Sequence, residues 1–351
     1  MTTEAHIREA FASQAYWAEK LGSPFTGLVC KLAGERLDAA TPVGKAVLGW
    51  SGDPDPMADN LPLRLAGSLH ALVMNGEAPA LAALYPPNPT PSPDALWGAL
   101  SDTIAAHPGA LIQRLAVAPQ TNEAGRAAAI MTGLMTVAAQ YPLPFELFEL
   151  GCSAGLNLNL ARFSYDLGGV AQGPVGSPVH LKPKWVGPPP PSARVEILST
   201  RGVDISPLDV RKPEDRERLI AYVWPEQAER LARVRAAVDL ALKFPPHIDV
   251  SDAAAWTEQT LLPEPTPGVI RALYHTIAYQ YFPAETQERI RAHADKVGAR
   301  ATKDAPFAWL RMEADPEFDR KPSIRLTLWP DGAERVLGVA HPHGKGVELF
   351  E

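Results

Sequence analysis

The chain has 351 residues and a formal net charge of −7. This length is enough for two domains, or for one large domain with an extensive core. Because basic and acidic residues are mixed along the chain, the charge pattern argues against a nucleic acid as the partner.

The sequence also bears on the compartment. Its two cysteines, Cys30 and Cys152, lie in different regions and predict no disulfide framework, which favours a reducing environment. The N-terminal residues are charged and amphipathic, unlike a signal peptide. No apolar stretch approaches the roughly 18 residues that a membrane helix needs. We therefore expect a cytoplasmic protein without a membrane partner.

Residues 1–141 are expected to form an all-helical N-terminal cap domain. Apolar residues recur at helical spacing over 7–18 and 61–75, and Asn75-Gly76 is a good C-terminal cap. Strand patterns are almost absent here. Further helices are expected over 79–84, 94–107, 109–117 and from 120–126 through Ala139.

The pattern changes at Phe145–Leu150, a short apolar run closed by Gly151 that predicts a buried parallel strand. Residues 151–155 carry little side-chain bulk, and a helix is expected from Leu156. A strand, a glycine turn and a helix N-terminus form a cradle for a nucleotide or phosphate, because the first N–H groups of a helix are unpaired.

Several interpretations of this turn compete. A dinucleotide fingerprint would need glycine where Ser153 and Leu156 stand, so it fails at two of three positions. Gly-Cys-Ser-Ala-Gly at 151–155 matches the nucleophile elbow of serine hydrolases, with Ser153 at the apex. In the third interpretation, the acid Glu149 and the glycines of the turn form an S-adenosylmethionine loop. A glycine-rich connection without any ligand also stays open.

The rest of the chain alternates between strand and helix patterns, which predicts an α/β fold. Residues 163–193 are an irregular insert, and Pro330-Asp331-Gly332 is a strong hairpin signal. We expect residues 142–351 to form a doubly wound, mostly parallel sheet with a C-terminal antiparallel hairpin. The expected strands are 179–185, 194–199, 202–205, 247–250, 268–275, 307–312, 323–329 and 334–341, and the expected helices are 225–244 and 284–297.

This half of the chain resembles the class I S-adenosylmethionine-dependent methyltransferases, which implies a Rossmann-like fold and that cofactor. Glu149-x-Gly151-x-x-x-Gly155 stands where that family has its first cofactor loop. The glycines would let the backbone approach the methionine part of the cofactor, and Glu149 would bind its ammonium end. The cofactor-binding residues expected in and beside this loop are Glu149, Gly151, Cys152, Ser153, Gly155 and Asn157.

Two further segments carry the resemblance. Asp204, in Gly202–Pro207, stands where the family has an acid that binds both ribose hydroxyls, and Asp252 stands where it has an acid near the adenine amine. Asp204 follows Gly151 by 53 residues, whereas about 20 is usual for a ribose acid. The insert accounts for the extra length but leaves Glu196 and Asp209 as rivals for the ribose.

The chain also resembles an uncharacterised bacterial family, known as a domain of unknown function. The shared segments are Gln120–Glu123 with Gly125-Arg126, Ser153–Asn157, Trp224-Pro225 and His341–Gly344. This resemblance spans most of the chain and implies no particular reaction.

Residues that directly follow strands are the candidates for chemistry, because ligands bind beyond the carboxyl ends of parallel strands. His275 is a candidate general base, or else a hydrogen-bonded wall residue. Tyr279 is the second catalytic candidate, or else part of the core. Substrate-binding candidates are Glu313, after a later strand, and Asn122 and Arg126, where an arginine either clamps a carboxylate or forms a surface ion pair.

The serine hydrolase alternative needs an acid and then a histidine after Ser153. His341, with Asp304, Asp315 or Asp331 before it, satisfies that order formally. This alternative lacks an upstream glycine-rich oxyanion loop, and it leaves the acids at 204 and 252 without a role.

No metal is expected, because the pair His341 and His343 has no third ligand at a recognisable spacing. The expectation is therefore a methyltransferase whose helical cap covers a pocket for a small-molecule acceptor. A catalytically silent binding module with the same sheet is a third possibility.

Overall fold

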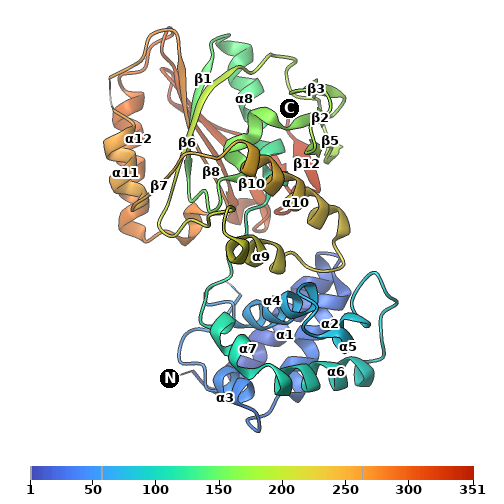
Figure 1. The fold of residues 1–351 in the computed structure, drawn as a ribbon. Coiled ribbons are helices and arrows are strands. Elements are labelled where there is room, and N and C mark those ends of the chain that lie inside the picture. The colour runs from blue at the N-terminus through green and yellow to red at the C-terminus, as the bar shows by residue number, and fades with distance from the viewer. Residues whose placement is uncertain (1, 57, 263) are drawn as a thin grey trace. The chain divides into compact units, whose positions relative to one another are not determined.

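The computed structural model describes residues 2–56, 58–262 and 264–351, which fold into two compact units (Figure 1). The first unit takes the chain up to Thr121 together with residues 213–232, and the second takes residues 122–212 and 233–351. The sequence placed the boundary at residue 141. The difference arises because helix α8 (Ala127–Gln140) packs on strands of the second unit.

The first unit is helical, as the sequence predicted. Proline occupies the first turn of α2 to α7, where its missing N–H costs nothing and its fixed φ favours the helix. The helices are α1 (Glu4–Lys20), α2 (Pro24–Arg36), α3 (Pro42–Leu48), α4 (Leu61–Met74), α5 (Pro79–Ala82), α6 (Pro93–Ala106), α7 (Pro108–Leu115) and α9 (Pro213–Ala221).

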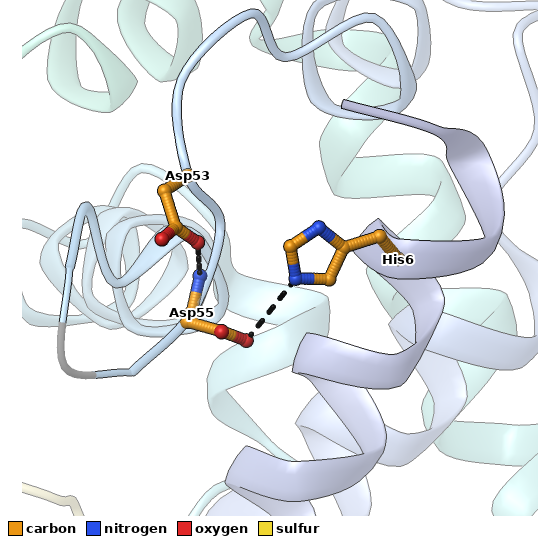
Figure 2. Close-up of side chains that lie close together, drawn as sticks. All are labelled: His6, Asp53 and Asp55. Carbon is orange, nitrogen blue, oxygen red and sulfur yellow. Dashed lines mark hydrogen bonds and ion pairs between the residues drawn. The ribbon is translucent and has the colours of Figure 1, made fainter. Parts of the chain in front are cut away.

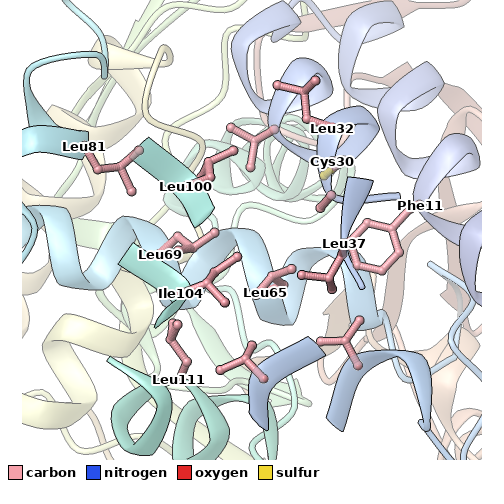
Figure 3. Close-up of a cluster of buried hydrophobic side chains, with 14 of the residues drawn as sticks. Phe11, Cys30, Leu32, Leu37, Leu65, Leu69, Leu81, Leu100, Ile104 and Leu111 are labelled. Atoms are coloured by element: carbon pink, nitrogen blue, oxygen red, sulfur yellow. The ribbon is translucent and has the colours of Figure 1, made fainter. Parts of the chain in front are cut away.

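A leucine-rich core holds this unit together (Figure 3). Leu65 and Leu69, one turn apart on α4, pack with Phe11 from α1 and Ile104 from α6, and all four are at most 2% exposed. Burying each such side chain stabilises the fold by about 1.5–3 kcal/mol. The apolar spacing seen in the sequence is therefore the spacing of this core.

The second unit contains a large, mostly parallel sheet. Among the described residues its strand order is β5-β12-β11-β10-β9-β8-β1-β6-β7; β7-β6-β1-β8-β9 form a continuous parallel part, and β12 and β5 also pair parallel. The predicted C-terminal hairpin is confirmed, since β10 and β11 pair antiparallel. The strands are β1 (Phe145–Leu150), β5 (Lys184–Val186), β6 (Ile197–Asp204), β7 (Ile248–Val250), β8 (Ile270–Thr276), β9 (Phe307–Ala314), β10 (Pro322–Trp329), β11 (Ala333–Ala340) and β12 (Gly346–Leu349).

Helices cover both faces of this sheet. The α11/α12 face packs Trp256, Ile290 and Phe307 in one cluster, and the α8 face packs Ala129 against Met312 (Figure 1). The helical elements are η1 (Ala124–Arg126), η2 (Leu156–Arg162), α10 (Ala228–Lys243), α11 (Ala253–Thr260), η3 (Tyr279–Tyr281), α12 (Ala284–Gly298) and η4 (Pro316–Phe318). The insert adds a small sheet of β2 (Ser164–Leu167), β3 (Val170–Gln172) and β4 (His180–Leu181).

Two elements differ from expectation near the turn. The two strands expected at 194–199 and 202–205 are one strand, β6, because Gly202 does not end it. A Cβ at Gly202 would lie 2.8 Å from Cys152 Sγ, so this strand position accepts only glycine. The helix expected from Leu156 is the 3₁₀ helix η2, in which the side chains of Asn157 and Asn159 bond to backbone carbonyls elsewhere.

The carboxyl ends of the parallel strands meet at one edge of the sheet. The loops after β1, β6, β7 and β8 therefore lie along this carboxyl edge. Within the part of the chain that the structure describes, no helix is both long and apolar enough to cross a membrane.

Candidate functional site

The turn after β1 is built from left-handed backbone. Gly151 has φ +63° and Gly155 has φ +67°, conformations that glycine adopts without steric cost. A Cβ at Gly151 would lie 2.6 Å from Ala278 Cβ, and one at Gly155 would lie 2.8 Å from Ile248 Cδ1. These glycines were expected to admit a cofactor, and in the structure they also let the turn pack against its own chain on those two sides.

Asp204 lies directly beside this turn. Its Oδ2 accepts a hydrogen bond from the Ser153 N–H at 2.8 Å, and its Oδ1 accepts one from the Ser206 N–H at 2.9 Å. The strand register explains this, because Leu150 at the end of β1 pairs with Val203 on β6. The acid after the second parallel strand and the turn after the first thus form one structural group.

Glu149, the last acid of β1, is almost completely buried at 2% exposure. Burial raises its pKa to about 8, although a hydrogen bond from Tyr274 and the charge of Arg126 act in the opposite direction. The Tyr274 hydroxyl donates to Glu149 Oε2 at 3.0 Å, and the two residues face each other across β1 and β8. At neutral pH this carboxyl group is therefore mostly protonated.

Two buried polar atoms beside these groups lack a hydrogen-bond partner among the described residues: Ser153 Oγ and Asn157 Oδ1. Leaving such an atom unpaired costs about 1–3 kcal/mol. Ser153 also has φ +54°, and Ile277, after β8, has φ +50°, a value that is rare for a β-branched residue. Strained backbone and unpaired polar atoms of this kind gather at functional sites. The carboxyl edge is therefore the best candidate for a ligand site.

Cys152 was also expected to bind the cofactor. Its side chain is buried against Gly202, and its N–H donates to the carbonyl of Val203. Burial raises the pKa of this thiol well above its usual value, so a reactive thiolate is disfavoured. The structure gives Cys152 a packing role.

Asn122 and Arg126 were candidates for substrate binding, and the structure joins both to the chain itself. Asn122 Oδ1 accepts a hydrogen bond from the Leu156 N–H at 2.8 Å. Arg126 donates to the carbonyls of Thr276 (3.0 Å) and Pro342 (2.9 Å). These residues therefore fix the turn and the end of β8.

The sequence analysis missed a buried ion pair in the same region. Glu123 accepts hydrogen bonds from the Gly125 N–H and from Arg233, each at 2.9 Å, and Arg233 also donates to the carbonyl of His343 at 3.0 Å. Glu123 lies in the 120–126 segment that the sequence analysis had selected. Arg233 lies among the arginines of a predicted amphipathic helix, and no sequence signal indicated that it would pair with Glu123. The ion pair links the 122–126 segment to the 341–344 segment.

His275 and Tyr279, the catalytic candidates, belong to a different cluster with Glu313. The Trp309 indole donates to His275 Nε2 at 3.1 Å, so His275 Nδ1 carries the proton and donates to Glu313 at 2.7 Å. The Tyr279 hydroxyl donates to the carbonyl of Gln287 at 2.6 Å. Both ring nitrogens of His275 and the hydroxyl of Tyr279 are thus engaged within the chain.

Glu313, expected to bind a substrate, is bonded within this cluster. Its carboxylate accepts hydrogen bonds from the backbone N–H groups of Ala278 (3.1 Å), Tyr279 (3.2 Å) and Gln280 (3.4 Å). It therefore holds the strained segment after β8 in place.

Asp252 lies after β7, as expected, and its hydrogen-bond partner is a backbone N–H only three residues further along the chain. Its side chain accepts a hydrogen bond from the Ala255 N–H at 2.9 Å and caps α11. Arg289 Nη1 lies 3.9 Å from it. The sequence around Asp252 does not distinguish such a helix cap from a ligand-binding acid.

The comparison with family models gives one result. The family described as an uncharacterized protein conserved in bacteria (DUF2332) matches residues 8–348. The chain belongs to this family. A search of curated proteins found no match. In this DUF2332 member, the segments at 122–126, 153–157 and 341–344 converge on the carboxyl edge of the sheet, through the contacts of Asn122, Arg126 and Arg233.

The first unit of this family member contains a separate group of metal-ligand residues, His6, Asp53 and Asp55 (Figure 2). Their ligand atoms lie within 4.8 Å of one another, and His6 Nε2 is 3.5 Å from Asp55 Oδ1. These side chains are partly or fully solvent-exposed, and such groups commonly occur on surfaces without an ion. We assign no metal to them.

Proposed function

We propose that this protein is an S-adenosylmethionine-dependent methyltransferase, built on a Rossmann-like sheet, that acts on a small-molecule acceptor. The observation that carries the proposal is the 2.8 Å hydrogen bond from the Ser153 N–H to Asp204. It joins a glycine turn after the first parallel strand to a carboxylate after the second. A ligand that combines an amino acid with a ribose needs both of these features.

The strand order supports the proposal. Numbered along the chain, the parallel strands β7-β6-β1-β8-β9 have the order 3-2-1-4-5 of doubly wound sheets. In such sheets the ligand binds beyond the carboxyl ends, where the strand order reverses. Here that point lies at the end of β1, next to the turn.

The residues present fit the cofactor. Each Asp204 oxygen already accepts one N–H bond and has a second lone pair for a ribose hydroxyl. The unpaired Ser153 Oγ and Asn157 Oδ1 offer further polar contacts. Glu149 would hold the ammonium group of the cofactor, and Asp252 would lie near its adenine.

When bound, S-adenosylmethionine supplies an electrophilic methyl group. The contribution of this chain would be positioning, which is worth roughly 7–11 kcal/mol when the reacting groups are held in line. Since Glu149 has a pKa of about 8, an ammonium group beside it would favour ionisation and release the carboxyl proton. His275 and Tyr279 have no catalytic role in this proposal because their polar atoms are engaged elsewhere.

Binding of S-adenosylhomocysteine tests the proposal. By isothermal titration calorimetry we expect Asp204→Asn to weaken binding by about 10- to 100-fold, since a hydrogen bond to a charged group is worth about 1.5–3 kcal/mol. The comparison variant is Asp209→Asn, which changes the rival for the ribose in the same loop; its carboxylate pairs with Arg211, so we expect little loss of binding. Absence of binding at millimolar ligand, or equal loss in both variants, would contradict the proposal.

The serine hydrolase alternative retains one supporting observation, the left-handed backbone of Ser153. It lacks a base, because Ser153 Oγ has no hydrogen-bond partner among the described residues. Labelling by a fluorophosphonate probe that is lost in Ser153→Ala would favour it over methyl transfer. Tight S-adenosylhomocysteine binding without turnover on broad acceptor panels would instead favour a silent binding module.

A further inference from the structure

A groove of about 350 Å³ lies in the second unit, beside the first half of β6. We call it the β6 groove. Its walls are formed by the part of η2 from Leu158 to Arg162, by residues 197–200 of β6, and by the last residue of α10, Lys243, with residues 244–247 after it. None of these residues belongs to the turn or to the acids of the proposed cofactor site.

One wall of the β6 groove is an open strand edge. Strand β7 pairs only with Gly202–Asp204, so residues 197–201 have a strand neighbour on one side only. The Gly202 N–H donates outward to the carbonyl of His247 at 2.9 Å. Because backbone direction alternates along a strand, the N–H and C=O of Thr200 point to the same outer side. This edge offers one donor and one acceptor to another strand.

The groove is also basic and partly apolar. Arg162, Lys243 and His247 line it, and none of its described lining residues is acidic. One lining residue has an acidic neighbour, since Asp249 Oδ1 lies 3.6 Å from His247 Nε2. This positive charge stands out in a chain with a net charge of −7.

Two large apolar side chains remain exposed in the groove. Leu198 is 55% exposed and Phe244 is 45% exposed. The guanidinium of Arg162 lies 4.2 Å from the centre of the Phe244 ring, which holds the cation over the groove. An occupant that covers these side chains would have to carry apolar groups as well as negative charge.

We infer that the β6 groove binds an extended peptide segment of a partner protein in which acidic and apolar side chains alternate. The segment adds a strand beside Thr200, so that its backbone pairs with the open edge. Its apolar side chains cover Leu198 and Phe244, and its carboxylates approach Arg162 and Lys243. This mode of recognition uses main-chain bonds for affinity and side chains for specificity. It does not depend on the proposed methyltransferase activity.

Fluorescence polarisation with a labelled seven-residue peptide of alternating valine and glutamate tests the inference. A lysine–valine peptide tests the charge, and a valine–glutamate peptide with N-methylated amides tests the strand pairing. We expect only the unmodified acidic peptide to bind, with the N-methylated form at least about tenfold weaker, which corresponds to about 1.4 kcal/mol.

Two pairs of variants locate the binding site. Arg162→Glu with Lys243→Glu should weaken binding about tenfold or more, whereas Lys303→Glu with Lys321→Glu, which changes the charge equally at exposed positions, should not. Thr200→Pro removes the outward N–H without removing a bond to β1, and Thr200→Val keeps that N–H. Only the proline variant should weaken binding while its melting temperature stays close to that of Thr200→Val.

Equal binding of the acidic and N-methylated peptides would overturn the strand pairing and leave a site for anions alone. Equal loss in the two double variants would place the binding elsewhere. Failure of the acidic peptide to bind at millimolar concentration would overturn the inference as a whole.

Discussion

Tyr274 and His275 are neighbours on β8, but they belong to two clusters of different construction on opposite faces of the sheet. Leu273 and His275 pack on the α11/α12 face, and Tyr274, between them, bonds to Glu149 on the other face. In the His275 cluster the donors and acceptors described above are paired. In the Glu149 cluster a carboxyl group is buried with a raised pKa, and two nearby polar atoms lack partners.

This difference separates a structural cluster from a candidate binding cluster. A fully paired polar network rigidifies the fold, whereas a buried group with unmet bonding capacity is poised for a ligand. Motif spacing in the sequence pointed to both clusters alike. The pairing of individual atoms distinguishes them.

The largest effect should be a pH dependence of stability caused by Glu149. Its folded pKa of about 8 lies above its ordinary value of 4.5, so the native state keeps a proton that the unfolded chain releases between these values. The stabilising contribution of Glu149 should therefore be complete below about pH 4.5 and fall by roughly 4 kcal/mol as the pH rises to 8, at about 1.4 kcal/mol per unit.

Urea unfolding from pH 5 to pH 9 measures this effect as the difference between the native chain and Glu149→Gln. The glutamine keeps an acceptor for Tyr274 but does not titrate. As the pH rises, we expect the native chain to lose more unfolding free energy than Glu149→Gln does. Parallel pH profiles for the two proteins would show that Glu149 ionises normally.

The His275 cluster should respond to loss of its carboxylate rather than to pH. Glu313→Ala leaves three backbone N–H groups and His275 without their acceptor, so we expect a loss of about 3 kcal/mol in unfolding free energy. The control Glu317→Ala removes an exposed ion pair with Arg325 and should cost at most about 1 kcal/mol. Similar losses would contradict a structural role for Glu313.

The smallest expected effect on stability comes from substitutions of two buried tyrosines, Tyr274 and Tyr165. Tyr274→Phe removes the hydrogen bond that lowers the pKa of Glu149, so it should cost about 1 kcal/mol and move the Glu149 titration to higher pH. Tyr165→Phe removes a bond to the carbonyl of Leu160 and should cost a similar amount without moving that titration. The midpoint of the pH profile separates the two outcomes.

Most elements of the fold could be read from the sequence because their signals are local. The apolar run Phe145–Leu150 is β1, and the period of Leu61, Leu65 and Leu69 is the buried face of α4. The hairpin β10–β11 followed from the turn residues at 330–332. Strands β2, β3 and β12 were missed because they are short and depend on their partners.

The candidate site was foreseen in part. Glycine, serine and acid spacing correctly indicated that the turn at 151–155 and Asp204 lie at one edge, since parallel strands end together. Spacing did not show that Asn122 and Arg126 would bond to the backbone, or that Arg233 would pair with Glu123 across 110 residues. Such partners are chosen by three-dimensional proximity.

By itself, the sequence determined the periodicity of the elements, the glycine turn after β1 and membership of a bacterial family. The tertiary structure alone decided which face of the sheet each strand residue occupies, and therefore that Glu149 joins Tyr274 while His275 joins Glu313. The physical reason is that side chains alternate along a strand, so a shift of one residue changes every neighbour. Burial and pairing, which set the pKa of Glu149, arise only after those neighbours are in place.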